Sequence, residues 1–575
     1  MDEIKKDLQN PSKATHQDYF GRTITYICIA FVGLLVISIL YFITTRGIAT
    51  FTTNHVSLWK FLSGTNWNPG LLDKHGNPQI GALPMIVTSF SVTILAAVVA
   101  TPFALGVALF MTEIAPEKGT KILQPVIELL VGIPSVVYGF IGLSVIVPLI
   151  RHTFGGTGFG ILAGTLVLFV MVLPTITSLS VDSIKAVPMF YRSASLALGA
   201  TRWQTIYKVV LRAATPGILT AVIFGMSRAF GEALAVQMVI GNAVLMPHGL
   251  LTPSSTLTSQ LTTGIGNTTM GTLPNNALWS LALILLLMSL VFNILVRFIG
   301  KKGSLKKMNS KTSNNIATGV IYVLVAAVIG ILVFLLGYIL WTGIPHISWH
   351  FLTSAAQSFR AGGGVRDQLF NSMYLLVLTL IISFPIALGS GIYLSEYAPN
   401  NWFTGLIRTA VEVLSSLPSV VVGLFGYLLF VIQFNMGCSI LAGAIALTFF
   451  NLPLLTRSIE ESLQDVSQLQ REAGLSLGLS RWKTITGIVL PAAVPGILTG
   501  IILSAGRVFG EAAALIYTAG QSAPTVNYGD WNPVDPASFL NPLRPAETLA
   551  VHIWKLNTEA SPRMPPQFQV GHQPF

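Results

Sequence analysis

The chain has 575 residues, of which 52% are hydrophobic and only 10% are charged, and its mean hydropathy is +0.70. Soluble domains carry roughly 25% charged residues, so this composition excludes an ordinary soluble enzyme and indicates a protein embedded in membrane lipid. The formal net charge of +11 does not point to nucleic acid as a partner, because the basic residues gather between the apolar stretches, as in membrane proteins.

Long apolar segments recur along the whole chain. A helix needs about 20 residues to cross ~30 Å of hydrocarbon, and these segments suit helices better than the ~10-residue strands of a membrane barrel. The first segment is too long for a cleaved signal peptide and no small-residue cleavage site follows it, so we expect it to remain as a helix. We expect about eleven spans, near residues 24–45, 82–111, 122–150, 160–180, 217–241, 277–299, 318–341, 370–394, 409–433, 439–456 and 496–519.

The distribution of lysine and arginine predicts the orientation. With the N-terminus in the cytoplasm, the basic loop near Arg192 and Arg202 and the run "RFIGKKGSLKKMNSK" at 297–311 both lie inside, and few basic residues lie outside. The two cysteines, Cys28 and Cys438, lie in separate apolar spans, and no histidines are spaced as metal ligands. We therefore expect no disulfide and no metal site.

An internal repeat organises the chain. The segment "RSASLALGATRWQTIYKVVLRAATPGILT" at 192–220 matches "REAGLSLGLSRWKTITGIVLPAAVPGILT" at 471–499 at most positions without a gap. The same offset superposes "SRAFGEA" on "GRVFGEA", and with them Arg228 and Glu232 on Arg507 and Glu511. Upstream, "ELLVGIPSVVYGF" pairs with "EVLSSLPSVVVGL", and "TEIAP" pairs with "SEYAP".

This duplication predicts an all-α polytopic membrane protein with two parallel repeats of six helices each. An even number of spans gives both repeats the same orientation, and transport paths in such proteins commonly lie between the repeats. The second repeat lacks an apolar segment to match the sixth helix of the first, and the proline-rich end "ASPRMPPQFQVGHQPF" favours a truncation or frameshift over a naturally shortened repeat. The expected divisions are a cytoplasmic tail at 1–22, a first repeat at 23–300, a basic cytoplasmic linker at 301–316, a second repeat at 317–557 and an atypical tail at 558–575.

The repeated loop predicts a docking surface rather than a solvated connection. It combines a short amphipathic segment, a glycine and a second helical segment, and it is duplicated with few changes. "REAGLSLGLSRWKTITGIVLPAAVPGI" resembles the EAA loop of permease subunits in binding-protein-dependent ABC importers, although Ser193 and Arg212 of the first copy replace that family's glutamate and proline. In that family the loop forms a coupling helix that sits in a groove of the cytoplasmic ATPase. The resemblance implies ATPase coupling by segments 185–213 and 464–492, with the residues Arg192, Ala194, Gly199, Arg202, Trp203, Arg471, Glu472, Ala473, Gly478, Arg481 and Trp482.

Other motifs resemble one particular family of these importers. "GIPSVVYGFIGL", "LPSVVVGLFGY" and the paired "SRAFGEA" and "GRVFGEA" look like the two permease subunits of the phosphate-specific (Pst) importer, PstC-like then PstA-like, fused in one chain from about residue 20 to about residue 557. This implies a multi-pass protein of the bacterial cytoplasmic membrane that is not itself an enzyme and binds no cofactor. Its implied cargo is inorganic phosphate, and its implied partners are an extracellular phosphate-binding protein and an ATPase dimer that uses ATP and Mg. The sequence contains no G-x-x-x-x-G-K-[ST] loop for nucleotide phosphates.

The four charges inside apolar spans are the candidate substrate-path residues. Each costs about 2.5–3.5 kcal/mol on insertion, and a spacing of four places Arg228 and Glu232 on one helical face, where they can form a structural ion pair. A pair kept only for stability is replaceable by apolar residues at little loss. The alternative gives the charges a function: Arg228 and Arg507 converge from the two repeats as an anion site, and Glu232 and Glu511 hold them in place.

Two other functions fit parts of the sequence. An ABC importer permease for another oxyanion, molybdate or sulfate, fits equally well, because an arginine side chain alone does not discriminate between these anions and phosphate. An ion-coupled secondary anion transporter or channel explains the buried charges but not the duplicated coupling loop, because it has no ATPase to engage.

Overall fold

The structure is a computed structural model that describes residues 13–72, 78–299, 313–357, 363–399, 401–415, 417–522, 524 and 526–559. It is helical almost throughout, apart from one short antiparallel hairpin of β1 (Trp67–Leu72) and β2 (Pro78–Ile80). The predicted atypical tail from residue 560 onward and most of the predicted linker lie outside the described residues.

The first half of the chain contains thirteen described α-helices. They are α2 (Lys13–Thr52), α3 (Leu58–Ser63), α4 (Leu83–Leu109), α5 (Pro116–Gly132), α6 (Ser135–Ile141), α7 (Val147–Phe154), α8 (Ile161–Lys185), α9 (Met189–Ala197), α10 (Arg202–Thr205), α11 (Leu211–Gly231), α12 (Leu234–Ile240), α13 (Leu257–Gly264) and α14 (Leu273–Ile299). Short π-helical segments continue several of them, namely η1 (Phe110–Ile114), η2 (Gly142–Ile146) and η3 (Ile206–Val210), and a 3₁₀ turn, η4 (Ile265–Asn267), follows α13.

The second half repeats this order. Its helices are α15 (Ser313–Gly343), α16 (Trp349–Thr353), α17 (Arg366–Ile392), α18 (Trp402–Ser415), α19 (Ser419–Gly426), α20 (Ile440–Gln464), α21 (Gln468–Ser476), α22 (Arg481–Thr484), α23 (Leu490–Gly510), α24 (Leu515–Thr518) and α25 (Leu549–Glu559). The π-helical segments η6 (Tyr393–Tyr397), η7 (Tyr427–Gln433) and η8 (Ile485–Val489) occur at positions equivalent to those of the first half, and η5 (Ile344–His346) is a 3₁₀ turn.

Within the described residues, ten helices are long and apolar enough to cross a membrane, one fewer than the eleven expected. The difference lies in the predicted span 409–433, which is interrupted before Pro418 and leaves only the shorter apolar helix Ser419–Gln433. The predicted span 122–150 is interrupted in the same way, because Ile133 and Pro134 both have extended ψ angles, of 129° and 139°. Proline disfavours helical geometry in the residue before it, so the "IPS" and "LPS" motifs each break a span.

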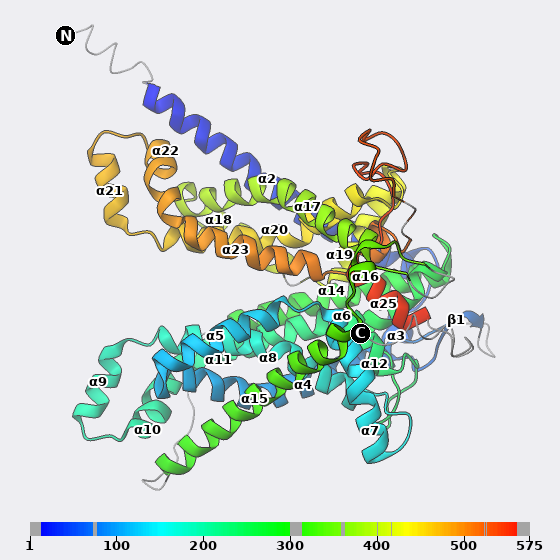
Figure 1. Ribbon diagram of the computed structural model, residues 1–575, viewed down its shortest axis with the longest axis horizontal. Helices are drawn as coiled ribbons and strands as arrows, with labels where there is room; N and C mark the ends of the chain where they lie inside the picture. The colour runs from blue at the N-terminus through cyan, green and yellow to red at the C-terminus, as the bar shows by residue number, and fades with distance from the viewer. Residues whose placement is uncertain are drawn as a thin grey trace.

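The two repeats lie side by side and run in the same direction, which confirms the parallel duplication. Figure 1 shows α9 and α10 of the first repeat and α21 and α22 of the second at one end of the molecule, together with the start of α2. We call this the repeat-loop end. The hairpin, α7, α16 and α25 lie at the opposite end (Figure 1).

The first helix of each repeat packs on the other repeat. Helix α2 lies along α17, α18 and α22 of the second repeat, as well as along α14, whereas α15 lies along α4 and α10 of the first repeat (Figure 1). A Cβ atom on Gly21 of α2 would overlap the indole of Trp482 in α22, so the glycine permits a close approach. On the other side, the rings of Tyr322 in α15 and Phe110 in η1 meet edge to face with centroids 5.4 Å apart.

Each repeat has the same helical core. Helix α8 packs on α4 and α11, and its counterpart α20 packs on α17 and α23. A serine hydroxyl fixes equivalent helix starts in the two cores, because Ser89 accepts the backbone N–H of Leu257 at 3.0 Å and Ser372 accepts that of Leu549 at 2.9 Å. Helix α25 therefore corresponds to α13.

Candidate functional site

Each of the two buried motifs breaks its helix directly before the glutamate. Helix α11 ends at Gly231 and α23 ends at Gly510, and the following residues, Glu232 and Glu511, have extended backbone with ψ angles of 132° and 129°. The predicted pairing of Arg228 with Glu232 on one helical face is therefore wrong, as it is for Arg507 with Glu511. No ion pair within 4.0 Å joins either couple in the part of the chain that the structure describes, although each arginine still interacts electrostatically with the glutamate of its own motif.

The glutamates instead bind the helix starts that follow the breaks. A carboxylate oxygen of Glu232 accepts the backbone N–H of Ala235 at 3.3 Å, and that of Glu511 accepts the N–H of Ala514 at 3.4 Å. Glu232 is also hydrogen bonded to Ser135 at the start of α6, and Glu511 to its counterpart Ser419 at the start of α19. Each glutamate thus accepts hydrogen bonds from groups that the helix breaks leave without a partner. An apolar side chain at the same position could not pair with them.

This leaves the two arginines with different neighbours. Arg228 Nη1 donates to Thr175 Oγ1 of α8 at 2.6 Å, whereas the Arg507 guanidinium lies 3.9 Å from the centroid of the Phe450 ring in α20. The Thr175 hydroxyl accepts one N–H, and the Phe450 ring attracts the cation without accepting a conventional hydrogen bond. Among their described contacts, both arginines therefore keep donors for a further partner.

The charged residues of the two repeats lie close enough to interact electrostatically. Arg507 interacts electrostatically with Arg228, and Glu511 with Glu232, across the boundary between the repeats. All four side chains lie deep within the protein, yet each keeps an intermediate exposed fraction. Two cations and two anions are therefore gathered near the boundary of the repeats, surrounded by protein but not fully buried.

The repeated loops form a helix, a tight turn and a second short helix, as the sequence predicts. Gly199 and Gly478 follow α9 and α21 with φ angles of +80° and +78°, a left-handed geometry that ends a helix and favours glycine. Within these loops the residues Gly199, Arg202, Glu472, Ala473, Gly478 and Arg481 are exposed, and Arg192, Ala194, Trp203, Arg471 and Trp482 are partly buried.

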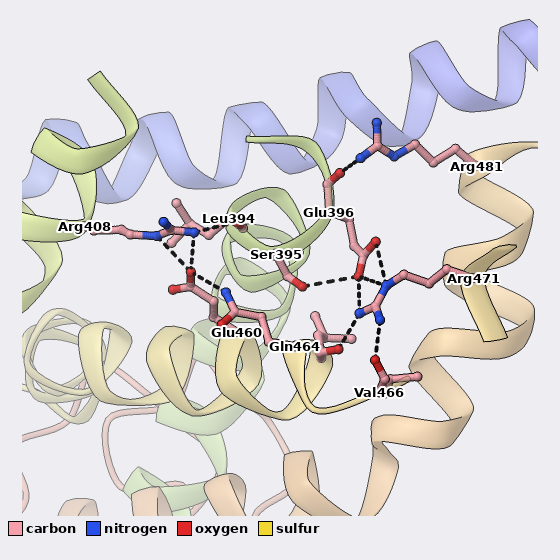
Figure 2. Close-up of polar contacts among 10 residues, drawn as sticks. Leu394, Ser395, Glu396, Arg408, Glu460, Gln464, Val466, Arg471 and Arg481 are labelled. Carbon is pink, nitrogen blue, oxygen red and sulfur yellow. Dashed lines mark hydrogen bonds and ion pairs between the residues drawn. The ribbon is translucent and has the colours of Figure 1, made fainter. Parts of the chain in front are cut away.

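Two arginines of each loop point back into the protein rather than away from it. In the second repeat, Arg471 Nη2 lies 2.8 Å from Glu396 Oε1, and Arg481 donates to the Glu396 backbone carbonyl (Figure 2). Arg471 also donates to the carbonyl oxygens of Val466 and Leu463, of which Figure 2 labels Val466.

The first repeat reproduces this arrangement. Arg192 Nη2 lies 2.7 Å from Glu113 Oε1, and Arg192 donates to the carbonyl oxygens of Ile184 and Val187. Arg202 donates to the Glu113 carbonyl. We call Glu113 with Arg192, and Glu396 with Arg471, the loop anchors.

Sequence reasoning missed several of these partners. Glu113 and Glu396 belong to the matched motifs "TEIAP" and "SEYAP", so a repeated acid beside a membrane helix end was the available signal. Ser135 and Ser419 follow the matched prolines in the same way. Thr175 and Phe450 carried no signal, because they are not equivalent positions of the repeat.

Comparison with known proteins places both repeats in one family. The profile of the family described as "Binding-protein-dependent transport system inner membrane component" matches residues 104–305 and again residues 383–532. No solved structure matches the chain.

Each curated relative matches half of the chain or less. The "Probable ABC transporter permease protein YqgH" of Bacillus subtilis is 51% identical over 283 residues, which are 49% of this chain and 90% of that protein. YqgI, described likewise, from the same organism, is 50% identical over 252 residues, 44% of this chain and 86% of that protein. Proteins named phosphate transport system permease PstC and PstA are also similar; PstC of Pasteurella multocida is 34% identical over 253 residues, 40% of this chain and 77% of that protein.

Proposed function

Because this chain belongs to the family of binding-protein-dependent transport system inner membrane components, we propose that it is the membrane-spanning part of an ATP-driven importer of inorganic phosphate. The chain is a multi-pass ABC transporter permease and not itself an enzyme, and its family implies a substrate-binding protein and an ATPase as partners. The similarity to PstC and PstA supports phosphate as the cargo.

The observation that carries the proposal is the electrostatic interaction of Arg228 with Arg507 across the boundary between the repeats. A guanidinium presents a planar fork of donors that fits phosphate oxygens and stays charged at any relevant pH. Glu232 and Glu511 are engaged at helix starts, so they leave the guanidinium donors available while keeping the site close to neutral. A site of balanced charge suits transport, because the cargo has to leave as well as bind.

The orientation follows from the loops. In this proposal the repeat-loop end and the N-terminus face the cytoplasm of a bacterium, where α9–α10 and α21–α22 dock an ATPase dimer that uses ATP and Mg. The opposite end, with the hairpin, α16 and α25, faces the extracellular phosphate-binding protein. The more basic composition of the loops at the repeat-loop end supports this choice.

Uptake of labelled phosphate tests the proposal. Bacteria that lack phosphate transport would carry this chain with its ATPase and binding protein, and unlabelled molybdate and sulfate would serve as competitors. We expect uptake that requires ATP and resists both competitors. Uptake that either competitor abolishes would assign a different oxyanion, and uptake without any ATPase would favour a secondary transporter.

Substitution of the arginines tests the site. Loss of a hydrogen bond to a charged group costs about 1.5–3 kcal/mol, so Arg228→Gln and Arg507→Gln should each lower uptake roughly tenfold or more. Arg457→Gln is the matched control, because Arg457 is an exposed arginine on α20, the helix that carries Phe450, and lies outside both coupling segments. Wild-type uptake by both Arg228→Gln and Arg507→Gln would refute the site.

A further inference from the structure

We propose that the loop anchors transmit movement of the coupling segments to the buried arginines, with Glu113 and Glu396 as positioning residues. The coupling segments here are α9–α10 and α21–α22. The inference rests on the proposed function in one respect, because it takes these segments to be where the ATPase docks. Otherwise it rests on the contacts of the described residues.

The anchors are built alike in both repeats and differ from surface ion pairs. The exposed fractions of the side chains are 14% for Arg192 and 10% for Glu113, and 14% for Arg471 and 7% for Glu396. By contrast, the pair Arg457–Glu461 has exposed fractions of 51% and 60%. Ion pairs shielded from water with several charge-assisted hydrogen bonds hold a fixed geometry, whereas exposed pairs contribute little.

In the second repeat the anchor spans a cleft. A cavity of about 400 Å³ separates α21 and α22 from the ends of η6 and α20, and its lining includes Ser395, Glu396, Gln464, Gln468, Arg471 and Arg481. Figure 2 shows the Arg471 side chain reaching from the coupling segment to Glu396 across this region. Because side chains do not fill this space, the anchor is the contact that holds the coupling segment to η6 and the end of α20, while Trp482 of α22 packs separately on α2.

One helix in each repeat connects the anchor with the buried arginine. Helix α8 carries Thr175, which binds Arg228, and its last turns carry Ile184, whose carbonyl accepts from Arg192. At a rise of 1.5 Å per residue these two points are about 14 Å apart along the helix.

Helix α20 has the same two contacts. It carries Phe450 beneath Arg507 and, about 20 Å further along, Leu463, whose carbonyl accepts from Arg471. A displaced coupling segment that is anchored in this way moves α8 or α20 as a unit, and with it the surroundings of the arginine. In a coupling segment without its anchor, the turn at Gly199 or Gly478 bends instead, and the displacement does not reach α8 or α20.

The test compares Glu113→Gln, Glu396→Gln and the double variant with the full-length wild type. Glutamine keeps the size of glutamate but removes the charge. The matched control is Glu461→Gln, which breaks the exposed pair Arg457–Glu461 within α20 and leaves the residues that line the cleft unchanged. Each protein would be reconstituted in vesicles with the ATPase and the phosphate-binding protein, and two quantities would be measured: phosphate taken up per ATP hydrolysed, and amide hydrogen exchange in residues 189–205 and 468–484.

We expect the double variant to retain the bound ATPase, to exchange these amides at least tenfold faster, and to take up at least tenfold less phosphate per ATP. The control should stay within twofold of the wild type in both quantities. Unchanged hydrogen exchange would show that the anchors do not hold the coupling segments. Faster exchange with unchanged uptake per ATP would show that the anchors stabilise the segments but do not transmit their movement. If the wild type carries no phosphate, the proposed function fails, while hydrogen exchange still decides whether the anchors position the segments.

Discussion

Gly510 of the second repeat packs directly on Pro134 of the first, and Gly231 packs on Pro418 in the reciprocal contact. A Cβ atom at residue 510 would lie 3.0 Å from the Pro134 Cα, whereas one at residue 231 would lie 3.4 Å from the Pro418 Cα. These contacts join the two repeats at their helix breaks, next to Arg228 and Arg507. The glycine of the second repeat therefore packs more tightly on the proline of the first repeat than the glycine of the first repeat packs on the proline of the second.

This asymmetry predicts unequal effects of the same substitution. Gly510→Ala introduces a methyl group against backbone, and such overpacking costs typically 1–3 kcal/mol. Gly231→Ala meets ordinary van der Waals distances, so we expect a change below about 1 kcal/mol. Thermal unfolding of the two purified variants in one detergent measures the difference, and equal midpoints would contradict the unequal packing.

The hydrogen bond from Arg228 to Thr175 predicts an effect on apparent affinity. Thr175→Val keeps the side-chain shape but removes the acceptor, so Arg228 loses a hydrogen bond of about 1.5–3 kcal/mol that fixes its direction. We expect the KM for phosphate uptake to rise by roughly tenfold. Thr177→Val on the same helix is the control, because the Thr177 hydroxyl binds only the Leu173 carbonyl among its described contacts. Equal KM values for the two variants would argue against a positioning role for Thr175.

The two coupling segments predict unequal docking of the ATPase. The first presents Met189, Phe190 and Tyr191, with Phe190 75% exposed, whereas the second presents Leu469 between two glutamines. Aromatic anchors dominate protein interfaces, and truncating one costs about 2 kcal/mol or more. We therefore expect Phe190→Gln to release more ATPase during purification than Leu469→Gln. Trp59→Gln, at the opposite end, is the control, and similar retention in all three variants would contradict the expected asymmetry.

A tyrosine at the opposite end predicts a pH dependence of stability. Burial and the hydrogen bond that Tyr528 donates to Asp367, at 2.8 Å, raise the pKa of Tyr528 to about 12. A raised pKa means that folding favours the protonated phenol, so its contribution is complete below the ordinary value of about 10 and is lost as the pH rises towards 12. The melting temperature of the wild type should therefore fall between pH 10 and 12 more steeply than that of Tyr528→Phe. Parallel curves would show that Tyr528 does not contribute.

The sequence predicted the fold at the level of the repeat. Length and hydropathy identified the membrane helices, and the matched loops identified the parallel duplication, because both signals extend over many residues. It did not predict the breaks at Pro134, Pro418, Glu232 and Glu511, since a helix that stops for one or two residues within an apolar run leaves the composition unchanged. The count of spans differed by one for the same reason.

The candidate site was predicted in its residues but not in its contacts. Arg228 and Arg507 stood out as charges in apolar surroundings, and in the structure they interact electrostatically across the boundary between the repeats, while their joint role as an anion site stays a prediction. The spacing of four wrongly paired each with its glutamate, because that inference assumes a continuous helix. The loop anchors escaped notice because Glu113 and Arg192 are far apart in sequence, and helix periodicity relates only near neighbours.

The exchange of first helices between the repeats has a consequence for biosynthesis. Helix α2 reaches the membrane early, but the helices α17, α18 and α22, on which it packs, begin roughly 310–430 residues later. Their synthesis takes about 15–90 s more at ~5–20 residues per second. Helix α14, its principal neighbour in the first repeat, is itself made roughly 220 residues after α2, and the surface at Gly21 that later receives Trp482 stays uncovered until α22 is made. The N-terminal half therefore cannot reach its final packing until most of the C-terminal half has been inserted, so the two halves mature together rather than in succession.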